Sequence, residues 1–179
     1  MGNVKLRVLI DTDEKKDVFR DILIGSQQSL DDLHKAIYSA FEFSGQEMAS
    51  FYTVNEEWDR LKEYPQEMLA EKGQANLSNT KVEDLLKAKE DRLLYVYDFF
   101  RMWCFFVEVI EVGTEKINKA EVLLSSGNPP AEDSKDPDFT MEGMGGNDDD
   151  DPYGLNDDPY ATDDDFPHES LDDLGDEYY

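Results

Sequence analysis

Apolar residues recur at every second position near the start of the chain. They are Val4, Leu6, Val8 and Ile10. This period of two predicts a strand that buries one of its faces. Residues 11–17 are polar and typical of a turn, and residues 18–24 form another strand-like run that ends at Gly25. The opening of the chain therefore predicts a β-hairpin.

A helical pattern begins at Ser29. Apolar residues then follow at spacings of three and four, at Leu30, Leu33, Ile37 and Phe41. Ser29 is followed three residues later by Asp32, which resembles a capping box with aspartate in place of the usual glutamate or glutamine. We predict an amphipathic helix from Ser29, and we expect His34 to lie off its apolar face as a structural histidine.

The middle of the chain carries shorter signals. Residues 49–54 predict a short strand. Proline is tolerated at the first position of a helix, so we expect a short helix from Pro65 to Lys72. Thr80 and Glu83 are spaced as a capping box and predict the start of another short helix.

Strand-like runs return over residues 93–97, 104–112 and 120–124. Strands thus dominate both ends of this part of the chain, and helices lie between them. We therefore predict an α+β fold, a single compact domain with a mostly antiparallel sheet flanked by helices.

Charge divides the chain in two. The whole sequence has 43 acidic and 17 basic residues and a net charge of -26. Residues 131–179 hold 19 of the acidic residues and one basic residue, and they contain few large aliphatic side chains. Such a segment buries too little apolar surface to offset the entropy of ordering it. We predict a folded domain over residues 1–130 and a disordered acidic tail over residues 131–179.

Composition argues against several classes of function. The acidic charge disfavours direct binding of nucleic acid by the domain. The sequence has neither an apolar run long enough to span a bilayer nor a secretory leader pattern, and Cys104 is a lone cysteine, so we expect a cytoplasmic protein. Cys104, His34 and His168 are too few for a zinc site, and Cys104 lies among aromatic residues. We assign no catalytic residue, metal or cofactor.

Three blocks of the sequence resemble the plasmid pRiA4b ORF-3-like family. Residues 30–37 are similar to its helix motif L-x-D-L-H-x-x-I, and residues 91–99 are similar to D-x-L-x-Y-x-Y-D-F. Trp103 stands where the family has the tryptophan of Y-D-F-G-D-G-W, and residues 127–133 resemble its late G-x-x-x-x-P-P-E-D. The resemblance covers residues 3–133. It implies an α+β domain with an antiparallel sheet but no settled activity; members occur near mobile elements, which is association and not mechanism.

The chain departs from this family where the pattern has Gly-Asp-Gly. Phe100, Arg101 and Met102 occupy those three positions. Glycines at such a turn permit a left-handed backbone, so their loss predicts a turn of altered shape. An exposed Phe100 and Met102 would form an apolar patch, and we predict that this segment binds a protein partner.

The acidic tail repeats clusters of acid with an aromatic residue. The aromatic residues are Tyr153, Tyr160, Phe166, Tyr178 and Tyr179. This composition is typical of segments that dock on a basic, partly apolar surface. Our leading hypothesis is a non-catalytic interaction protein whose domain and tail bind a basic protein, such as a polymerase or ribosomal complex, where the tail competes with nucleic acid.

Two alternatives remain open. In the first, the domain is a hydrolase or binds a small molecule in a pocket formed by His34, Tyr97, Asp98 and Trp103, and the tail only solubilises it. In the second, the protein is a mobile-element accessory protein that acts on DNA, which rests on family association alone.

Overall fold

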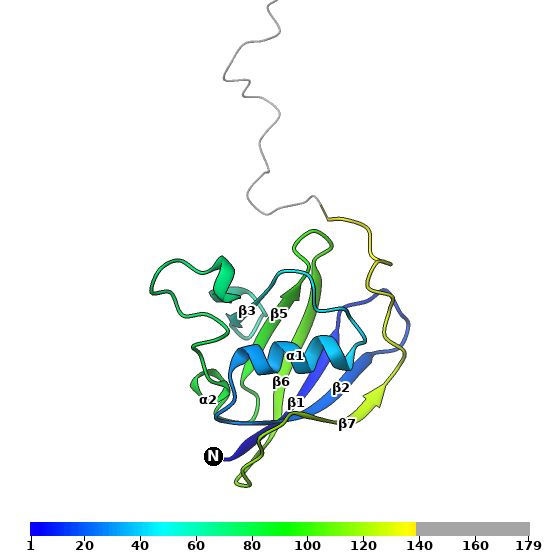
Figure 1. Cartoon of the computed structure of the whole chain (residues 1–179). Helices are drawn as coiled ribbons and strands as arrows, with labels where there is room; N and C mark the ends of the chain where they lie inside the picture. The colour runs from blue at the N-terminus through cyan, green and yellow to red at the C-terminus, as the bar shows by residue number, and fades with distance from the viewer. Residues whose placement is uncertain (139–179) are drawn as a thin grey trace, which may run out of the picture. The chain divides into compact units, whose positions relative to one another are not determined.

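The computed structural model of this protein describes residues 1–138. One antiparallel sheet runs through it in the order β4-β3-β5-β6-β1-β2-β7 (Figure 1). The strands are β1 (Asn3–Ile10), β2 (Val18–Gly25), β3 (Ala49–Val54), β4 (Arg60–Pro65), β5 (Arg92–Tyr97), β6 (Trp103–Gly113) and β7 (Glu121–Ser126). The helices are α1 (Leu30–Ala40), α2 (Val82–Leu85) and the 3-10 turn η1 (Glu67–Leu69). The predicted α+β fold with an antiparallel sheet is confirmed.

The core lies between the sheet and α1, which crosses one face of the sheet (Figure 1). The alternating residues of β1 point into it and are at most 3% exposed. The apolar residues of α1 meet them from the other side, and Leu30, Leu33 and Ile37 are fully buried. Each such side chain contributes about 1.5–3 kcal/mol through its removal from water. The two predicted hydrophobic patterns, one of strand and one of helix, therefore face each other.

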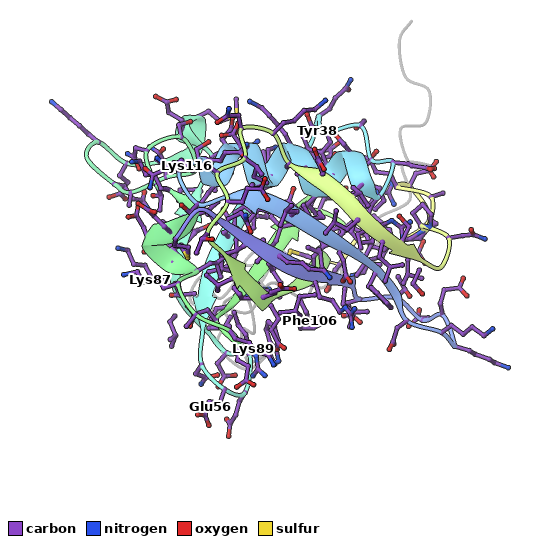
Figure 2. The ribbon with its side chains drawn as sticks, turned by 90° about the horizontal axis from the view of Figure 1, so that it is seen from below. Tyr38, Glu56, Lys87, Lys89, Phe106 and Lys116 are labelled. Atoms are coloured by element: carbon purple, nitrogen blue, oxygen red, sulfur yellow. The ribbon has the colours of Figure 1, made fainter. Side chains whose placement is uncertain are left out.

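The opposite face of the sheet carries its own aromatic contacts. Figure 2 shows α1 and Tyr38 on one side of the sheet and Phe106 on the other. The ring of Phe106 meets the edge of Trp58 at 4.9 Å between centroids, and the guanidinium of Arg92 lies 5.1 Å from the Trp58 ring. This face is thus built from aromatic side chains and the aliphatic parts of charged ones.

Arg20 is an exception to the apolar pattern of the core. It faces the same side of the sheet as Val8, its neighbour in the strand pairing, and is 4% exposed. Its guanidinium donates to the carbonyl of Ala40 at 3.0 Å, at the end of α1, and to that of Ser126 at 2.9 Å, at the end of β7. It also lies 5.0 Å from the ring of Phe41. Arg20 therefore ties the end of α1 to the edge of the sheet.

The helix expected from Ser29 is present with the expected cap. The Ser29 hydroxyl accepts from the Asp32 N–H at 3.1 Å, and the Asp32 carboxylate accepts from the Ser29 N–H at 2.9 Å. The strands expected over residues 4–10, 18–24, 49–54, 93–97 and 104–112 are also present, and the last one is shifted to Glu121–Ser126. Among the helices that the structure describes, none is long and apolar enough to cross a bilayer.

The helix expected from Pro65 to Lys72 is wrong. Pro65 ends β4, and only the short turn η1 follows it. β4 lies at the edge of the sheet and exposes most of its side chains, with Leu61 66% exposed, so its sequence carries no pattern of a buried face. The capping box predicted at Thr80 is wrong, because the helix begins after Lys81, whose side chain has no acceptor; only the Asp84 carboxylate caps this end, accepting from the Lys81 N–H at 2.8 Å.

Candidate functional site

The most connected polar site lies at one end of the sheet, where β5 passes into β6. Tyr97 and Trp103 are paired in the register of these strands and are both buried. The ring of Phe43 packs on both, at 5.5 Å and 5.4 Å between centroids. Tyr97 and Trp103 thus form a fixed aromatic wall at the end of the core.

Glu132 joins this wall to the far end of the described chain. The Tyr97 hydroxyl donates to the Glu132 carboxylate at 2.6 Å, and the Ser44 N–H and hydroxyl donate to it at 2.7 Å and 2.9 Å. The Trp103 indole N–H donates to the Glu132 backbone carbonyl at 2.9 Å. We call Ser44, Tyr97, Trp103 and Glu132 the Glu132 clasp. It holds three segments that are far apart in sequence.

The clasp also sets the charge state of its two central groups. Burial alone would raise the pKa of Glu132, but hydrogen bonds from Tyr97 and Ser44 outweigh it and lower that pKa. Burial raises the pKa of Tyr97, and its hydrogen bond to Glu132 raises it further. Near neutral pH, Glu132 is therefore an ionised acceptor and Tyr97 a protonated donor, which is the arrangement that makes a strong charge-assisted hydrogen bond.

A tight turn over residues 98–102 connects β5 to β6. The Asp98 carboxylate accepts from the N–H groups of Phe100 at 3.0 Å and Arg101 at 3.1 Å. Both Asp98 and Met102 adopt a left-handed backbone, with φ of 60° and 55°. Met102 stands where the family pattern has glycine, so it keeps the backbone conformation that a glycine favours although it carries a side chain.

The chain beyond Pro130 returns to this turn. The Lys135 ammonium donates to the Met102 carbonyl at 2.7 Å and lies 5.5 Å from the centroid of the Trp103 ring. The Arg101 guanidinium donates to the Lys135 carbonyl. The Asp138 N–H donates to the Phe100 carbonyl at 2.9 Å. The predicted boundary at Pro130 therefore falls inside a segment that is bonded to the sheet.

The segment predicted to bind a partner is thus contacted by its own chain. Arg101 pairs with Asp98 at 3.7 Å in addition to its bond to Lys135, and Met102 is half-buried. Phe100 remains 56% exposed. Of the three residues, Phe100 presents the largest apolar surface to solvent. Binding of a partner at this segment stays a prediction.

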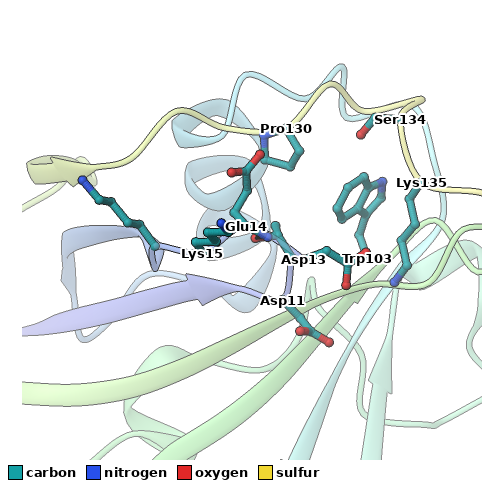
Figure 3. A pocket seen from close by; sticks show the side chains of 10 residues that line it. Asp11, Asp13, Glu14, Lys15, Trp103, Pro130, Ser134 and Lys135 are labelled. Carbon is teal, nitrogen blue, oxygen red and sulfur yellow. Dashed lines mark hydrogen bonds between the residues drawn. The ribbon is translucent and has the colours of Figure 1, made fainter.

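A pocket of about 700 Å³ lies beside Trp103 (Figure 3). It is lined on one side by Trp103, Pro130 and Lys135 and on the other by the loop between β1 and β2. That loop supplies both signs of charge, through Asp11, Asp13, Glu14, Lys15 and Lys16. Of the four residues expected around a pocket, Trp103 alone is among those that line this one in the described structure.

His34 belongs to a different cluster, under α1. Its Nδ1 lies 2.7 Å from the Tyr95 hydroxyl and its Nε2 lies 3.3 Å from Nε2 of Gln66. His34 is 3% exposed, so the expectation that it points away from the core is wrong. Burial lowers its pKa to about 4, against a smaller raising effect of Asp31. His34 is therefore neutral near pH 7 and connects α1 to β5.

The other candidate groups are placed as follows. Cys104 is half-buried, and burial raises the pKa of its thiol. Within residues 1–138, no group of three or more His, Cys, Asp or Glu side chains is placed to hold a metal ion. The tail residues Tyr153, Tyr160, Phe166, His168, Tyr178 and Tyr179 lie outside the described residues.

The three motif blocks noticed in the sequence meet in these two clusters. His34 of the helix motif contacts Tyr95 of the strand motif, and Tyr97 of that same motif contacts Glu132 of the late block. A model of the plasmid pRiA4b ORF-3-like family matches residues 3–153. The chain belongs to this family. In this member, the motif residues therefore hold α1 and the segment after β7 to the sheet.

A comparison with solved structures supports the fold and says nothing on activity. A crystal structure of a protein of unknown function from Methanosarcina mazei Go1 is similar, with a TM-score of 0.62 and 20% sequence identity. The similarity covers 75% of this chain and 74% of that chain. At this identity, the likeness shows a shared fold. No curated protein matches the sequence.

The sequence did not predict that Glu132 and Arg20 connect distant segments through several hydrogen bonds. The signal for Glu132 was its place in the late family block, because the pattern P-P-E-D includes this glutamate. The signal for Arg20 was weaker: it is a charged residue at a core-facing position of an otherwise apolar strand.

Proposed function

We propose that this protein is a non-enzymatic interaction protein that binds a basic protein partner through its acidic, aromatic C-terminal stretch. The partner that we favour is nucleic-acid-handling machinery, such as a polymerase or ribosomal complex. The acidic stretch would then occupy a surface that otherwise binds nucleic acid. Its aromatic residues, Tyr153, Tyr160, Phe166, Tyr178 and Tyr179, would act as the apolar anchors.

The observation that carries the proposal is the position of the Glu132 clasp. The sequence after Asp138 holds 15 acidic residues and no Lys or Arg. Immediately before it, Glu132 and Lys135 are bonded to Tyr97, Trp103 and Met102. The Asp138 N–H donates to the Phe100 carbonyl at 2.9 Å, so the chain is bonded to the domain up to the residue that precedes the acidic stretch. A partner held by the stretch would thereby stay tethered to the domain.

The groups that could carry chemistry support a binding role. Glu132 and Tyr97 bond to each other, and His34 is neutral and bonded to Tyr95. In the described part of the chain, no buried side-chain nitrogen or oxygen lacks a hydrogen-bond partner. These groups stabilise the fold in the arrangement described. We place the protein in the cytoplasm, where a lone thiol such as Cys104 stays reduced.

The test compares the full-length chain with a charge-neutralised chain. In the latter, every Asp and Glu after Asp138 is replaced by Asn or Gln, so the length and the Glu132 clasp are kept. Truncation after Pro130 is a poor substitute, because it also removes Glu132 and Lys135 from the domain.

Both chains are immobilised and exposed to cell extract over a series of salt concentrations. We expect a basic complex to bind the natural chain, to be released by salt and by added duplex DNA, and to be absent from the neutralised chain. Equal capture by both chains at every salt concentration would overturn the proposal.

The pocket beside Trp103 favours a second candidate, binding of a small zwitterionic molecule. Its rim offers the ammonium groups of Lys15 and Lys16 and the carboxylates of Asp11, Asp13 and Glu14. A library of amino acids and other zwitterions is screened by chemical-shift perturbation of the Trp103 indole N–H. A specific, saturable shift supports this candidate, and its absence across the library counts against it.

A further inference from the structure

The two edges of the sheet are built differently. The outer strand β4 carries Arg60, Lys62 and Glu63 and ends in Pro65. Charged side chains and proline are the usual devices that prevent an edge strand from pairing with another chain. The outer strand at the other end, β7, has Glu121 as its one charged residue. Both edge strands have a register shift in their pairing, but β7 lacks the charges and the proline that protect β4.

β7 also presents apolar side chains at its free edge. Val122, Leu123 and Leu124 are 47%, 49% and 48% exposed. The pairing with β2 shifts register at Leu123, so Val122 and Leu124 lie on opposite faces of the sheet. Val122 lies opposite Ile22 on the α1 side, and Leu124 lies opposite Asp21 on the other side. Among the described strands, β7 pairs only with β2 (Figure 1). An added strand would thus find backbone hydrogen-bonding groups between apolar side chains on both faces.

Arg20 keeps this edge in place. Its guanidinium donates to the carbonyls of Ser126 at 2.9 Å and Gly127 at 3.3 Å, at the end of β7, and to Ala40 at the end of α1. The strand is therefore held at its end by a buried side chain. An edge that is already ordered loses less entropy when a peptide binds to it.

We infer that β7 binds an extended, basic segment of a protein partner, which adds to the sheet as a further strand. The inference rests on the proposed function for the sign of the partner's charge. The described residues hold 28 acidic and 17 basic residues, a net charge of -11, so a basic segment is attracted to this domain. A second copy of the chain would carry the same -26 and be repelled, which disfavours pairing of two β7 strands.

The test uses full-length protein and a defined probe. The probe is a blocked peptide in which a short run of valines is flanked on both sides by lysines. A control peptide has the same lysines, but proline replaces alternate valines, so it keeps the charge and loses backbone donors needed for strand pairing. Affinity is measured by fluorescence anisotropy, and binding to β7 is located by hydrogen exchange of its backbone amides.

Two matched variants separate the edge from general charge. Leu123→Lys places a charge on β7, and Leu61→Lys places the same charge on the edge strand β4, where Leu61 is 66% exposed. Both side chains lie at the surface, so both variants keep the fold, which circular dichroism checks. We expect Leu123→Lys to weaken binding of the valine peptide about tenfold and Leu61→Lys to leave it within about twofold.

The outcomes distinguish this inference from the proposed function. Slower exchange of the amides of Val122–Ser126 with the valine peptide, and not with the proline peptide, supports the inference. If both peptides bind alike and the β7 amides are unchanged, the inference is overturned while binding to basic partners stands. If neither peptide binds, the inference is overturned, and the proposed function is still decided by the capture experiment with the natural and neutralised chains. If the free protein is a dimer that Leu123→Lys dissociates, a second copy occupies β7 and the inference is wrong.

Discussion

The indole N–H of Trp103 donates to the backbone carbonyl of Glu132 at 2.9 Å, while the carboxylate of the same Glu132 accepts from Tyr97 at 2.6 Å. Glu132, in the segment that follows β7, therefore uses both its backbone and its side chain to hold the end of the β5–β6 pair. In this chain, the relationship joins a tryptophan, a tyrosine and a glutamate that all stand at family-motif positions.

Replacing Glu132 by Gln is expected to lower the free energy of unfolding by about 1 kcal/mol, because charge-assisted hydrogen bonds become neutral ones. The pKa of Glu132 is lowered in the folded state, so its contribution is present above the unfolded pKa and is lost as pH falls through the folded value. The difference between natural protein and variant in urea unfolding should therefore be larger at pH 7 than at pH 3. Asp133→Asn, at the exposed neighbouring position, is the control and should show little difference at either pH.

Acidification should destabilise the protein through His34. Its folded pKa is about 4, below the unfolded value near 6.5, so the unfolded chain binds the additional proton between these two values. The stability contributed by neutral His34 is present above pH 6.5 and falls as pH drops toward 4, by up to about 3 kcal/mol. In His34→Gln, which keeps a hydrogen-bonding side chain, urea unfolding at pH 7, 5.5 and 4.5 should lose most of this slope. An unchanged slope in the variant would show that another group is responsible.

The turn at Met102 should accept glycine with a gain in stability. Met102 has a φ of 55°, a conformation that costs a residue with a side chain about 1–2 kcal/mol. Glycine removes this cost but makes the unfolded chain more flexible, so we expect a net gain of about 0.5–1 kcal/mol for Met102→Gly. Met102→Ala also removes the long side chain but keeps the strain. The midpoint of urea unfolding should therefore be higher for glycine than for alanine, and the reverse order would contradict a left-handed Met102.

The buried guanidinium of Arg20 should be difficult to replace. Arg20→Met has a similar length but leaves the carbonyls of Ala40 and Ser126 without their donor, so we expect a loss of about 2–4 kcal/mol. Lys35→Met is the control, because Lys35 is exposed and its pair with Asp31 on α1 should contribute less than about 0.5 kcal/mol. Thermal unfolding measures both. Equal effects would mean that the bonds of Arg20 contribute no more than a surface pair.

Most of the elements that the sequence predicted bury at least one face. The period of β1 and the cap formed by Ser29 and Asp32 are local, and a local pattern is visible in one sequence. β4 was missed because it exposes most of its side chains and four of its six residues are Arg, Lys, Glu and Pro, which are unfavourable in strands. The equally exposed edge strand β7 was predicted because its centre is the aliphatic run Val122–Leu124.

The candidate site was less predictable because its bonds are long-range. Glu132 binds Ser44, 88 residues away, and His34 binds Tyr95, 61 residues away. His34 follows Leu30 by four residues and precedes Ile37 by three, so it lies on the buried face of α1, and its hydroxyl partner Tyr95 comes from β5. The resemblance to family motifs identified the participants, but the structure was needed to pair them.

The order of attachments along the chain has a mechanical consequence. A pull on the chain beyond Asp138 would load first the bond from Asp138 to Phe100, next the bonds of Lys135, and then those of Glu132. Only after these break does the pull reach β7, which Arg20 holds at Ser126. The Glu132 clasp would therefore have to break before any strand is peeled from the C-terminal side of the sheet.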